Sequence, residues 1–159
     1  MNYDIMLFRG EINIKILVDA DACPSKNILE SIAKENGIRI IFYCCISSLF
    51  SMEYGEVILV DQGFQMVDMK IANACEKGDI VITQDYGVAS MVLGKGCYAI
   101  NPRGMIYDNA NIDGLLMQKH ISSKIRRGGG RTTNPKKRTK NDENILANNL
   151  FKLININYN

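Results

Sequence analysis

Short runs of branched apolar residues alternate with segments whose apolar residues recur at helical spacing, and this alternation constrains the fold most. The runs are continuous rather than alternating in polarity, which indicates strands that are buried on both faces. Because parallel strands need crossover connections, the pattern predicts an α/β fold with a mostly parallel five-stranded sheet and helices on both faces. The predicted strands cover residues 12–18, 38–46, 57–60, 80–83 and 97–100.

The intervening segments carry signals for helix starts and stops. Pro24 suits the first turn of a helix that ends at Gly37, and Gly78 and Gly94 close the next two helices. Asn141 is a candidate N-cap for a terminal helix. Helices are therefore predicted over residues 24–36, 66–77, 88–93, 112–125 and 142–154.

A length of 159 residues with 47% hydrophobic residues suits one compact domain. No apolar run is long enough to span a membrane, and the first residues lack the features of an export signal. The sequence thus predicts a cytoplasmic protein that does not associate with membranes. The expected parts are an N-terminal extension (1–11), the α/β domain (12–126), a basic glycine-containing loop (127–141) and a C-terminal helix that packs on the domain (142–159).

Cysteine and histidine offer little catalytic chemistry in this chain. The five cysteines show no Cys-x-x-Cys or Cys/His pair at metal spacing, which argues against a disulfide framework and against a zinc site. His120 is the single histidine, which argues against a histidine-based hydrolase. Cys23 lies near the start of the first helix and is either a structural thiol or one that is exposed to oxidation.

The net charge of +2 hides a strong asymmetry. Residues 119–140 contain nine Lys or Arg and no Asp or Glu, whereas the rest of the chain contains ten basic and seventeen acidic residues. A cationic segment interrupted by Gly128–Gly130 can neutralise phosphates with little regard for base sequence. The alternative, a solubilising segment, stays open at this point. The candidate phosphate contacts in this segment are Arg126, Arg127 and Arg131.

Acidic residues follow several of the predicted strands, at the edge where ligands bind in open parallel sheets. Asp19 and Asp21 follow the first strand and Asp85 follows the fourth, while Asp68 lies on the helix after the third. Oxygen ligands without histidine or thiolate are those that Mg²⁺ and Mn²⁺ prefer. Crowded carboxylates repel one another unless a cation neutralises them. We therefore predict a divalent-metal site at this edge of the sheet.

Several of these candidate residues also have a structural interpretation. Asp21 and Asp85 are each placed to act as the N-cap of the helix that follows. Lys26 opposes the dipole of the first helix, so it is either a phosphate ligand or a solvated lysine. Asn101 and Arg103 form either a turn in which the Arg side chain forks onto a phosphate or a plain turn.

Four motifs, taken in order, resemble the YaiI/YqxD family of uncharacterised bacterial proteins. They are V-D-A-D-A-C-P-S-K at 18–26, D-x-V-I-T-x-D at 79–85, N-P-R-G at 101–104 and R-x-G-G-G at 126–130. The resemblance spans residues 14–151. The chain departs from the family pattern in two places, with Y-G-V-A at 86–89 and T-T-N-P-K-K-R at 132–138. The second departure removes an aromatic anchor and adds positive charge.

The family is regarded as PIN-like, so the resemblance implies a parallel α/β domain similar to metal-dependent ribonucleases. Its acidic motif falls on Asp19, Asp21 and Asp85, with Asp68 as a fourth acid. PIN-like domains often pair, which makes a homodimer a further expectation.

Two hypotheses follow from the sequence. In the first, the protein is a Mg²⁺- or Mn²⁺-dependent phosphodiesterase that acts on RNA or another nucleic acid. Asp19, Asp21 and Asp85 hold the metal, and Lys26, Asn101 and Arg103 contact phosphate. In the second, it is a non-catalytic nucleic-acid-binding module in which the acids serve as caps or as a structural cation site. Metal-dependent cleavage separates the two.

Overall fold

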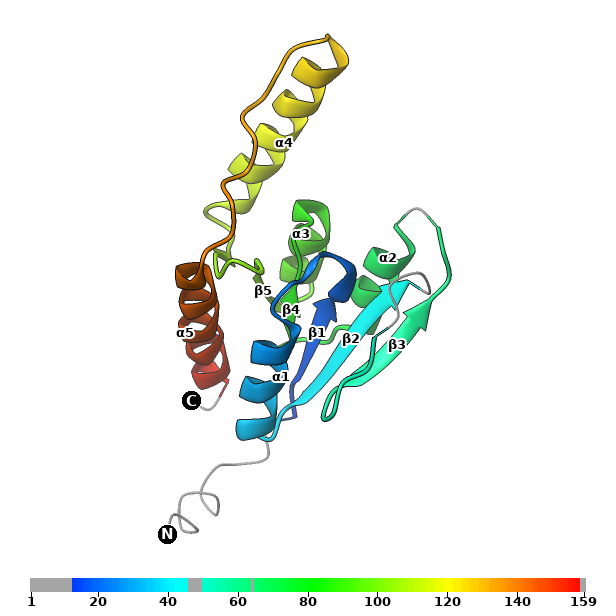
Figure 1. Cartoon of the computed structure of the whole chain (residues 1–159), viewed down its shortest axis with the longest axis vertical. Coiled ribbons are helices and arrows are strands. Elements are labelled where there is room, and N and C mark those ends of the chain that lie inside the picture. Colours follow the sequence, from blue (N-terminus) through cyan, green and yellow to red (C-terminus); the bar gives the residue numbers. More distant parts are fainter. Residues whose placement is uncertain (1–12, 46–49, 64, 158–159) are drawn as a thin grey trace.

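The computed structural model describes residues 13–45, 50–63 and 65–157. Within these ranges, six strands form one sheet in the order β3-β2-β1-β4-β5-β6 (Figure 1). The first five strands along the chain are parallel to their neighbours, and β6 is antiparallel to β5. The strands are β1 (Lys15–Asp19), β2 (Arg39–Cys45), β3 (Glu56–Val60), β4 (Ile80–Ile82), β5 (Tyr98–Ile100) and β6 (Ile106–Tyr107). The predicted α/β class is confirmed.

Helices cover both faces of the sheet, as predicted. One face packs against α1 and α5, and the other packs against α2, α3 and the start of α4 (Figure 1). A short 3-10 helix, η1, connects β1 to the loop before α1. The helices are η1 (Ala20–Ala22), α1 (Lys26–Glu35), α2 (Met66–Ala74), α3 (Tyr86–Gly94), α4 (Ile112–Arg127) and α5 (Lys140–Ile156). No helix in the described residues is long and apolar enough to cross a membrane.

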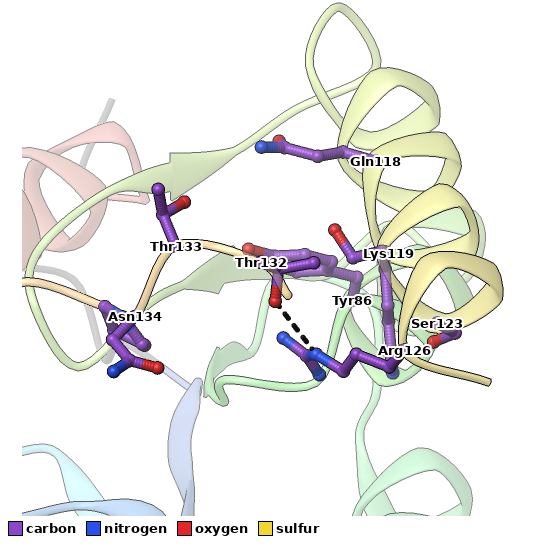
Figure 2. Close-up of a pocket in the computed structure, with 10 residues that line it drawn as sticks. Tyr86, Gln118, Lys119, Ser123, Arg126, Thr132, Thr133 and Asn134 are labelled. Carbon is purple, nitrogen blue, oxygen red and sulfur yellow. Dashed lines mark hydrogen bonds between the residues drawn. The ribbon is translucent and has the colours of Figure 1, made fainter. Parts of the chain in front are cut away.

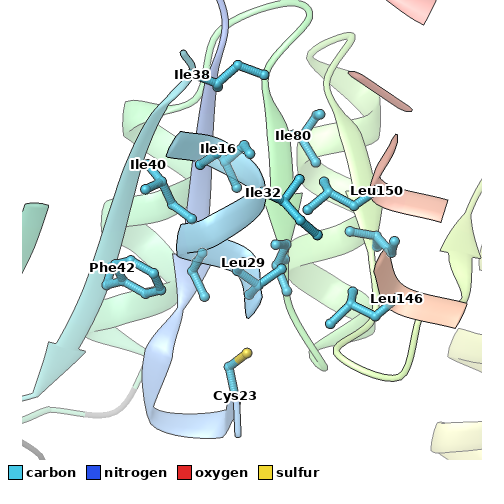
Figure 3. Close-up of a cluster of buried hydrophobic side chains, with 14 of the residues drawn as sticks. Ile16, Cys23, Leu29, Ile32, Ile38, Ile40, Phe42, Ile80, Leu146 and Leu150 are labelled. Carbon is cyan, nitrogen blue, oxygen red and sulfur yellow. The ribbon is translucent and has the colours of Figure 1, made fainter. Parts of the chain in front are cut away.

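The central strand β1 divides its side chains between two hydrophobic clusters. Ile16 and Val18 pack on the α1/α5 side, whereas Leu17 packs on the α2/α3 side, because successive strand side chains point to opposite faces. Figure 3 shows Leu29 of α1 and Leu146 of α5 among the buried side chains that cover the first of these faces. Burial on both faces explains why β1 is a continuous apolar run.

The prediction of five strands is wrong by one, because β6 was missed. Ile106 and Tyr107 pair with β5 through a tight turn, in which the Gly104 N–H donates to the Asn101 carbonyl at 2.8 Å. A two-residue strand is too short to show a period of two, so the sequence pattern carries no signal for it.

The terminal helix starts two residues earlier than predicted, and its N-cap is Thr139 rather than Asn141. The Thr139 Oγ1 accepts a hydrogen bond from the Asp142 N–H, and the Asp142 carboxylate accepts one from the Thr139 N–H. This reciprocal capping box satisfies two N–H groups, whereas a cap at Asn141 would satisfy one. The predicted extension over 1–11 lies outside the described residues.

Helix α4 stands away from the sheet, and residues 128–139, here called the strap, run back beside it to α5 (Figure 1). Two arginines hold the far end of the strap. The Arg103 guanidinium donates to the Lys136 carbonyl. Arg138 donates to the Pro102 carbonyl at 2.8 Å and to the Ser25 hydroxyl. The basic segment is therefore tied to the body of the domain.

Candidate functional site

The fold brings the four predicted acids to one edge of the sheet. Asp19 is the last residue of β1 and Asp21 lies in η1, directly after it. Asp85 is the N-cap of α3, which follows β4, and Asp68 lies in the first turn of α2. Strands β1 and β4 are neighbours in the centre of the sheet, so their carboxyl ends coincide. The predicted convergence thus depends on a strand adjacency that the structure confirms.

Two adjoining hollows mark this edge among the described residues. One, of about 440 Å³, is lined by Asp19, Asp68 and Asp85 together with Lys119. The other, of about 300 Å³, is lined by Asp19, Asp68 and Asp21 among others. Asp19 and Asp68 therefore face both hollows, and we call Asp19, Asp21, Asp68 and Asp85 the acidic cluster.

Burial and mutual repulsion act on the acidic cluster. Burial, followed by the negative charges of Asp68, Asp21 and Asp85, raises the pKa of Asp19 from 3.8 to about 6. Burial and the nearby Asp85 also raise the pKa of Asp68. The surroundings of Asp19 therefore disfavour its ionised form. A bound cation would relieve this by offsetting the neighbouring negative charges.

Asp85 serves the fold and faces the hollow at the same time. Its Oδ1 accepts a hydrogen bond from the Val88 N–H at 3.0 Å, so the predicted N-cap is present. Its Oδ2 lies 3.6 Å from the Nζ of Lys119, on α4. The cap fixes the orientation of the carboxylate and leaves its second oxygen toward the hollow.

The alternative prediction that Asp21 caps the first helix is wrong. Its carboxylate accepts hydrogen bonds from the Cys45 N–H at 3.1 Å and from the Cys45 Sγ at 3.0 Å. Helix α1 starts only at Lys26, with Ser25 at its N-cap position, because η1 intervenes. Asp21 therefore joins the ends of β1 and β2.

The donor chemistry of the acidic cluster fits a hard divalent cation, because it offers carboxylate oxygens without imidazole. A complete ligand set is not preformed: the described part of the chain holds no group of three or more His, Cys, Asp or Glu side chains already arranged to bind a metal ion. Asp21 and Asp85 each have an oxygen engaged in a hydrogen bond. Side-chain rotation would therefore accompany binding.

Replacing Asp19 by Asn should stabilise the protein at neutral pH in the presence of EDTA. Because the pKa of Asp19 is raised by folding, its protonated carboxyl contributes to the stability of the folded state. This stabilisation is complete below pH 3.8 and is lost as the pH rises through about 6. The asparagine side chain mimics the neutral acid at every pH. We expect urea unfolding to show Asp19→Asn about 1–3 kcal/mol more stable than wild type at pH 8 and equal to it at pH 3.5. A variant that is less stable at pH 8 would contradict the repulsion.

Three residues that are predicted to contact phosphate make hydrogen bonds within the fold. Lys26 Nζ donates to the Cys23 carbonyl at 2.7 Å and lies 5.0 Å from the centroid of the Phe50 ring. Asn101 Nδ2 donates to the Tyr107 hydroxyl at 3.1 Å, and its Oδ1 accepts from the Arg103 N–H at 2.7 Å. Among the described residues that line the two acidic hollows, none is Lys26, Asn101 or Arg103. The hydrogen bonds of Asn101 are those of a turn, which fits the plain-turn interpretation.

The basic candidates of α4 and the strap differ in their positions. Arg126 lines a further hollow, between α4 and the strap, and its Nε donates to the Thr132 hydroxyl at 3.0 Å. Arg127 and Arg131 are exposed and do not belong to its lining. Cys23 is buried, and burial raises the pKa of its thiol, so the structural interpretation of this cysteine holds.

Sequence reasoning missed Lys119 and Tyr86, which both line the larger acidic hollow. The helical spacing could have indicated Lys119. It lies seven residues after the buried Ile112 and hence on the face of α4 that begins against the sheet. Tyr86 directly follows Asp85 as the first residue of α3. Arg138 belongs to the basic run, and its contact with Ser25, 113 residues away in the chain, leaves no local signal in the sequence.

The fold and the site define an α/β protein with a carboxylate cluster at the carboxyl edge of a mostly parallel sheet. Residues 17–156 match the family described as "Uncharacterized BCR, YaiI/YqxD family", and the chain belongs to this family. The resemblance read from the motifs is thereby confirmed.

Relatives in clostridia are similar over nearly their whole length. A UPF0178 protein of Clostridium kluyveri is 57% identical over 141 residues, which cover 89% of this chain and 93% of the relative. A UPF0178 protein of Clostridium tetani is 56% identical, with 89% and 97% covered. Among solved structures, that of Rae1 (YacP) from Bacillus subtilis (W164L mutant) is 16% identical with a TM-score of 0.42, covering 89% of this chain and 98% of that one.

Proposed function

We propose that this protein is a Mg²⁺- or Mn²⁺-dependent phosphodiesterase that cleaves nucleic acid, with RNA as the favoured substrate. One observation carries the proposal: four carboxylates from different elements converge beside open hollows at the edge where α/β sheets bind ligands. Their mutual repulsion needs a balancing positive charge, and hard oxygen ligands select a hard divalent cation.

Asp19, Asp21, Asp68 and Asp85 would hold the cation. When bound, such an ion supplies a more acidic water and stabilises negative charge on a transferring phosphoryl group. The chain's own residues position the substrate. The α3 cap orients the Asp85 carboxylate, and the Lys119 ammonium, 3.6 Å from it, would contact a phosphate oxygen in the hollow.

Backbone phosphates further from the cluster would meet the basic surface of α4 and the strap. Arg126, Arg127 and Arg131 supply this attraction in the proposal. Lys26, Asn101 and Arg103 support the site differently, because they hold the η1–α1 loop, the β5–β6 turn and the strap in place. A structural role fits their observed contacts better than the phosphate contacts that the sequence suggested.

A non-catalytic nucleic-acid-binding module is the second candidate function. The ion pair between Lys119 and Asp85 favours it, because this pair already neutralises one acid without a metal ion. In that case the remaining acids would be structural, and binding would depend on salt but not on divalent cations.

Cleavage assays separate these two functions. Labelled single-stranded RNA, hairpin RNA and single-stranded DNA are incubated with the protein in Mn²⁺ or in EDTA, beside an identically purified Asp19→Asn preparation that controls for contaminating nucleases. The phosphodiesterase proposal predicts cleavage in Mn²⁺, fastest on RNA, and none in EDTA. Binding without cleavage in both conditions would establish the binding module instead.

A further inference from the structure

The hollow between α4 and the strap has a lining unlike that of the acidic cluster. It measures about 420 Å³, and α4 and the strap form its two walls. Figure 2 shows Arg126 reaching from α4 to Thr132 of the strap. Its polar lining includes Lys119, Ser122, Ser123, Arg126, Thr132 and Thr133, and no Asp or Glu is among the residues described as lining it.

This hollow lies next to the larger acidic hollow, with which it shares two lining residues. Tyr86 and Lys119 line both of them. Lys119 therefore stands between the carboxylates and a space lined by cations and hydroxyl groups. A chain molecule with alternating phosphates and sugars matches this arrangement, because its reacting phosphate can lie in one hollow while the next lies in the other.

Arg126 is oriented for an anion in this space. Its Nε is held by the Thr132 hydroxyl at 3.0 Å, whereas its two terminal nitrogens donate no hydrogen bond within the described ranges. A guanidinium fixed at one nitrogen presents the other two as a fork that suits phosphate oxygens. The neighbouring Ser and Thr hydroxyls supply further donors, and the Tyr86 ring supplies an aromatic surface where the two hollows meet.

We propose that this hollow binds the nucleotide next to the scissile phosphate of a single-stranded nucleic acid, with Arg126 on its phosphate. The inference rests on the proposed function and adds a substrate class to it. The two walls select the strandedness, because a nucleotide held in a duplex would bring its partner strand against α4 or the strap. A volume of about 420 Å³ falls in the usual range of small-ligand sites, about 300–1,000 Å³.

The test compares two adjacent arginines that carry the same charge. Arg126→Gln removes a cation inside the hollow, and Arg127→Gln removes one outside it. Fluorescence anisotropy in EDTA measures the Kd of a short single-stranded RNA without any cleavage. We expect Arg126→Gln to weaken binding about tenfold and Arg127→Gln by less than about twofold. Equal effects would show that the whole basic surface attracts RNA without a site, and would overturn the inference.

A second pair of variants leaves Arg126 and its contact with Thr132 in place. Ser123→Phe fills the hollow from α4, and His120→Phe places the same side chain on the exposed part of that helix. Only Ser123→Phe should weaken the binding of single-stranded RNA, again by about tenfold. Wild type should also bind the single strand more tightly than a duplex of the same sequence. Equal affinity for the two forms would contradict the selection of single strands.

The outcomes distinguish this inference from the function on which it rests. If Arg126→Gln alone weakens binding but wild type cleaves nothing in Mn²⁺, the hollow stands as a binding site for single-stranded nucleic acid, and the phosphodiesterase proposal fails. If wild type cleaves RNA in Mn²⁺ but Arg126→Gln and Arg127→Gln bind alike, the phosphodiesterase proposal stands and this inference fails.

Discussion

Asp19→Asn is expected to lose at least about hundredfold in the rate of Mn²⁺-dependent RNA cleavage while remaining folded. The negative charges of the other three members of the acidic cluster all act on Asp19, which lines both hollows at the end of the central strand. Asn keeps the size of the side chain but removes one anionic ligand. The loss should therefore appear in catalysis and not in stability, which is expected to rise at neutral pH.

A control for this variant is Glu35→Gln, which removes one negative charge from an exposed residue at the end of α1. It should cleave at the wild-type rate, because it lies outside both hollows. The comparison is made under single-turnover conditions at fixed Mn²⁺, with circular dichroism to confirm the fold. Cleavage by Asp19→Asn within twofold of Glu35→Gln would exclude the acidic cluster as the catalytic centre.

Gly104→Ala is expected to destabilise the protein by about 3 kcal/mol or more. Gly104 has a φ of +99°, which L side chains rarely adopt. A Cβ there would lie 2.5 Å from the Leu146 backbone nitrogen and 2.6 Å from the Ile145 Cγ2. Because backbone cannot yield as a flexible side chain can, α5 would have to move, and the fully buried Leu146 and Leu150 would move with it.

Urea unfolding of Gly104→Ala beside Gly114→Ala measures this cost. Gly114 lies inside α4 with nothing within 4 Å of the position that a Cβ would take, so Ala should be neutral there or stabilise the helix by up to about 1 kcal/mol. The Asn149 side chain also donates to the Gly104 carbonyl at 2.6 Å, so the turn and α5 are coupled. A Gly104→Ala midpoint equal to that of wild type would contradict the close approach.

The sequence predicted the main elements because their signals are local. Continuous apolar runs, the helix stop at Gly37, and aspartates after β1 and β4 are all readable within a few neighbouring residues. The stop predicted at Gly78 is wrong, because α2 ends at Ala74, with Cys75 at its C-cap position. The antiparallel β6 was not readable, since two residues show no period. Thr139 lacks the usual sequence signal of a capping box, because its partner is Asp142, a shorter acid than the usual Glu or Gln.

The sequence predicted the part of the candidate site whose position follows from where the strands end. Asp19, Asp21, Asp68 and Asp85 converge because adjacent parallel strands end together. The basic partners depend on long-range packing instead. Arg103 was expected to meet a phosphate, but it donates to the strap, and Lys119 reaches Asp85 only because α4 begins against the sheet. The residue type shows that a side chain can donate hydrogen bonds, but only the fold determines which acceptor lies within reach.

Titration calorimetry of Mn²⁺ into the protein at pH 7.5 tests the central claim most directly, namely that the acidic cluster binds a divalent cation. Wild type is expected to bind Mn²⁺, with affinity that falls as the pH drops below about 6, where protons compete for Asp19. Asp19→Asn should bind at least about tenfold more weakly. The absence of Mn²⁺ binding by wild type, or an equal affinity in Asp19→Asn, would contradict the claim.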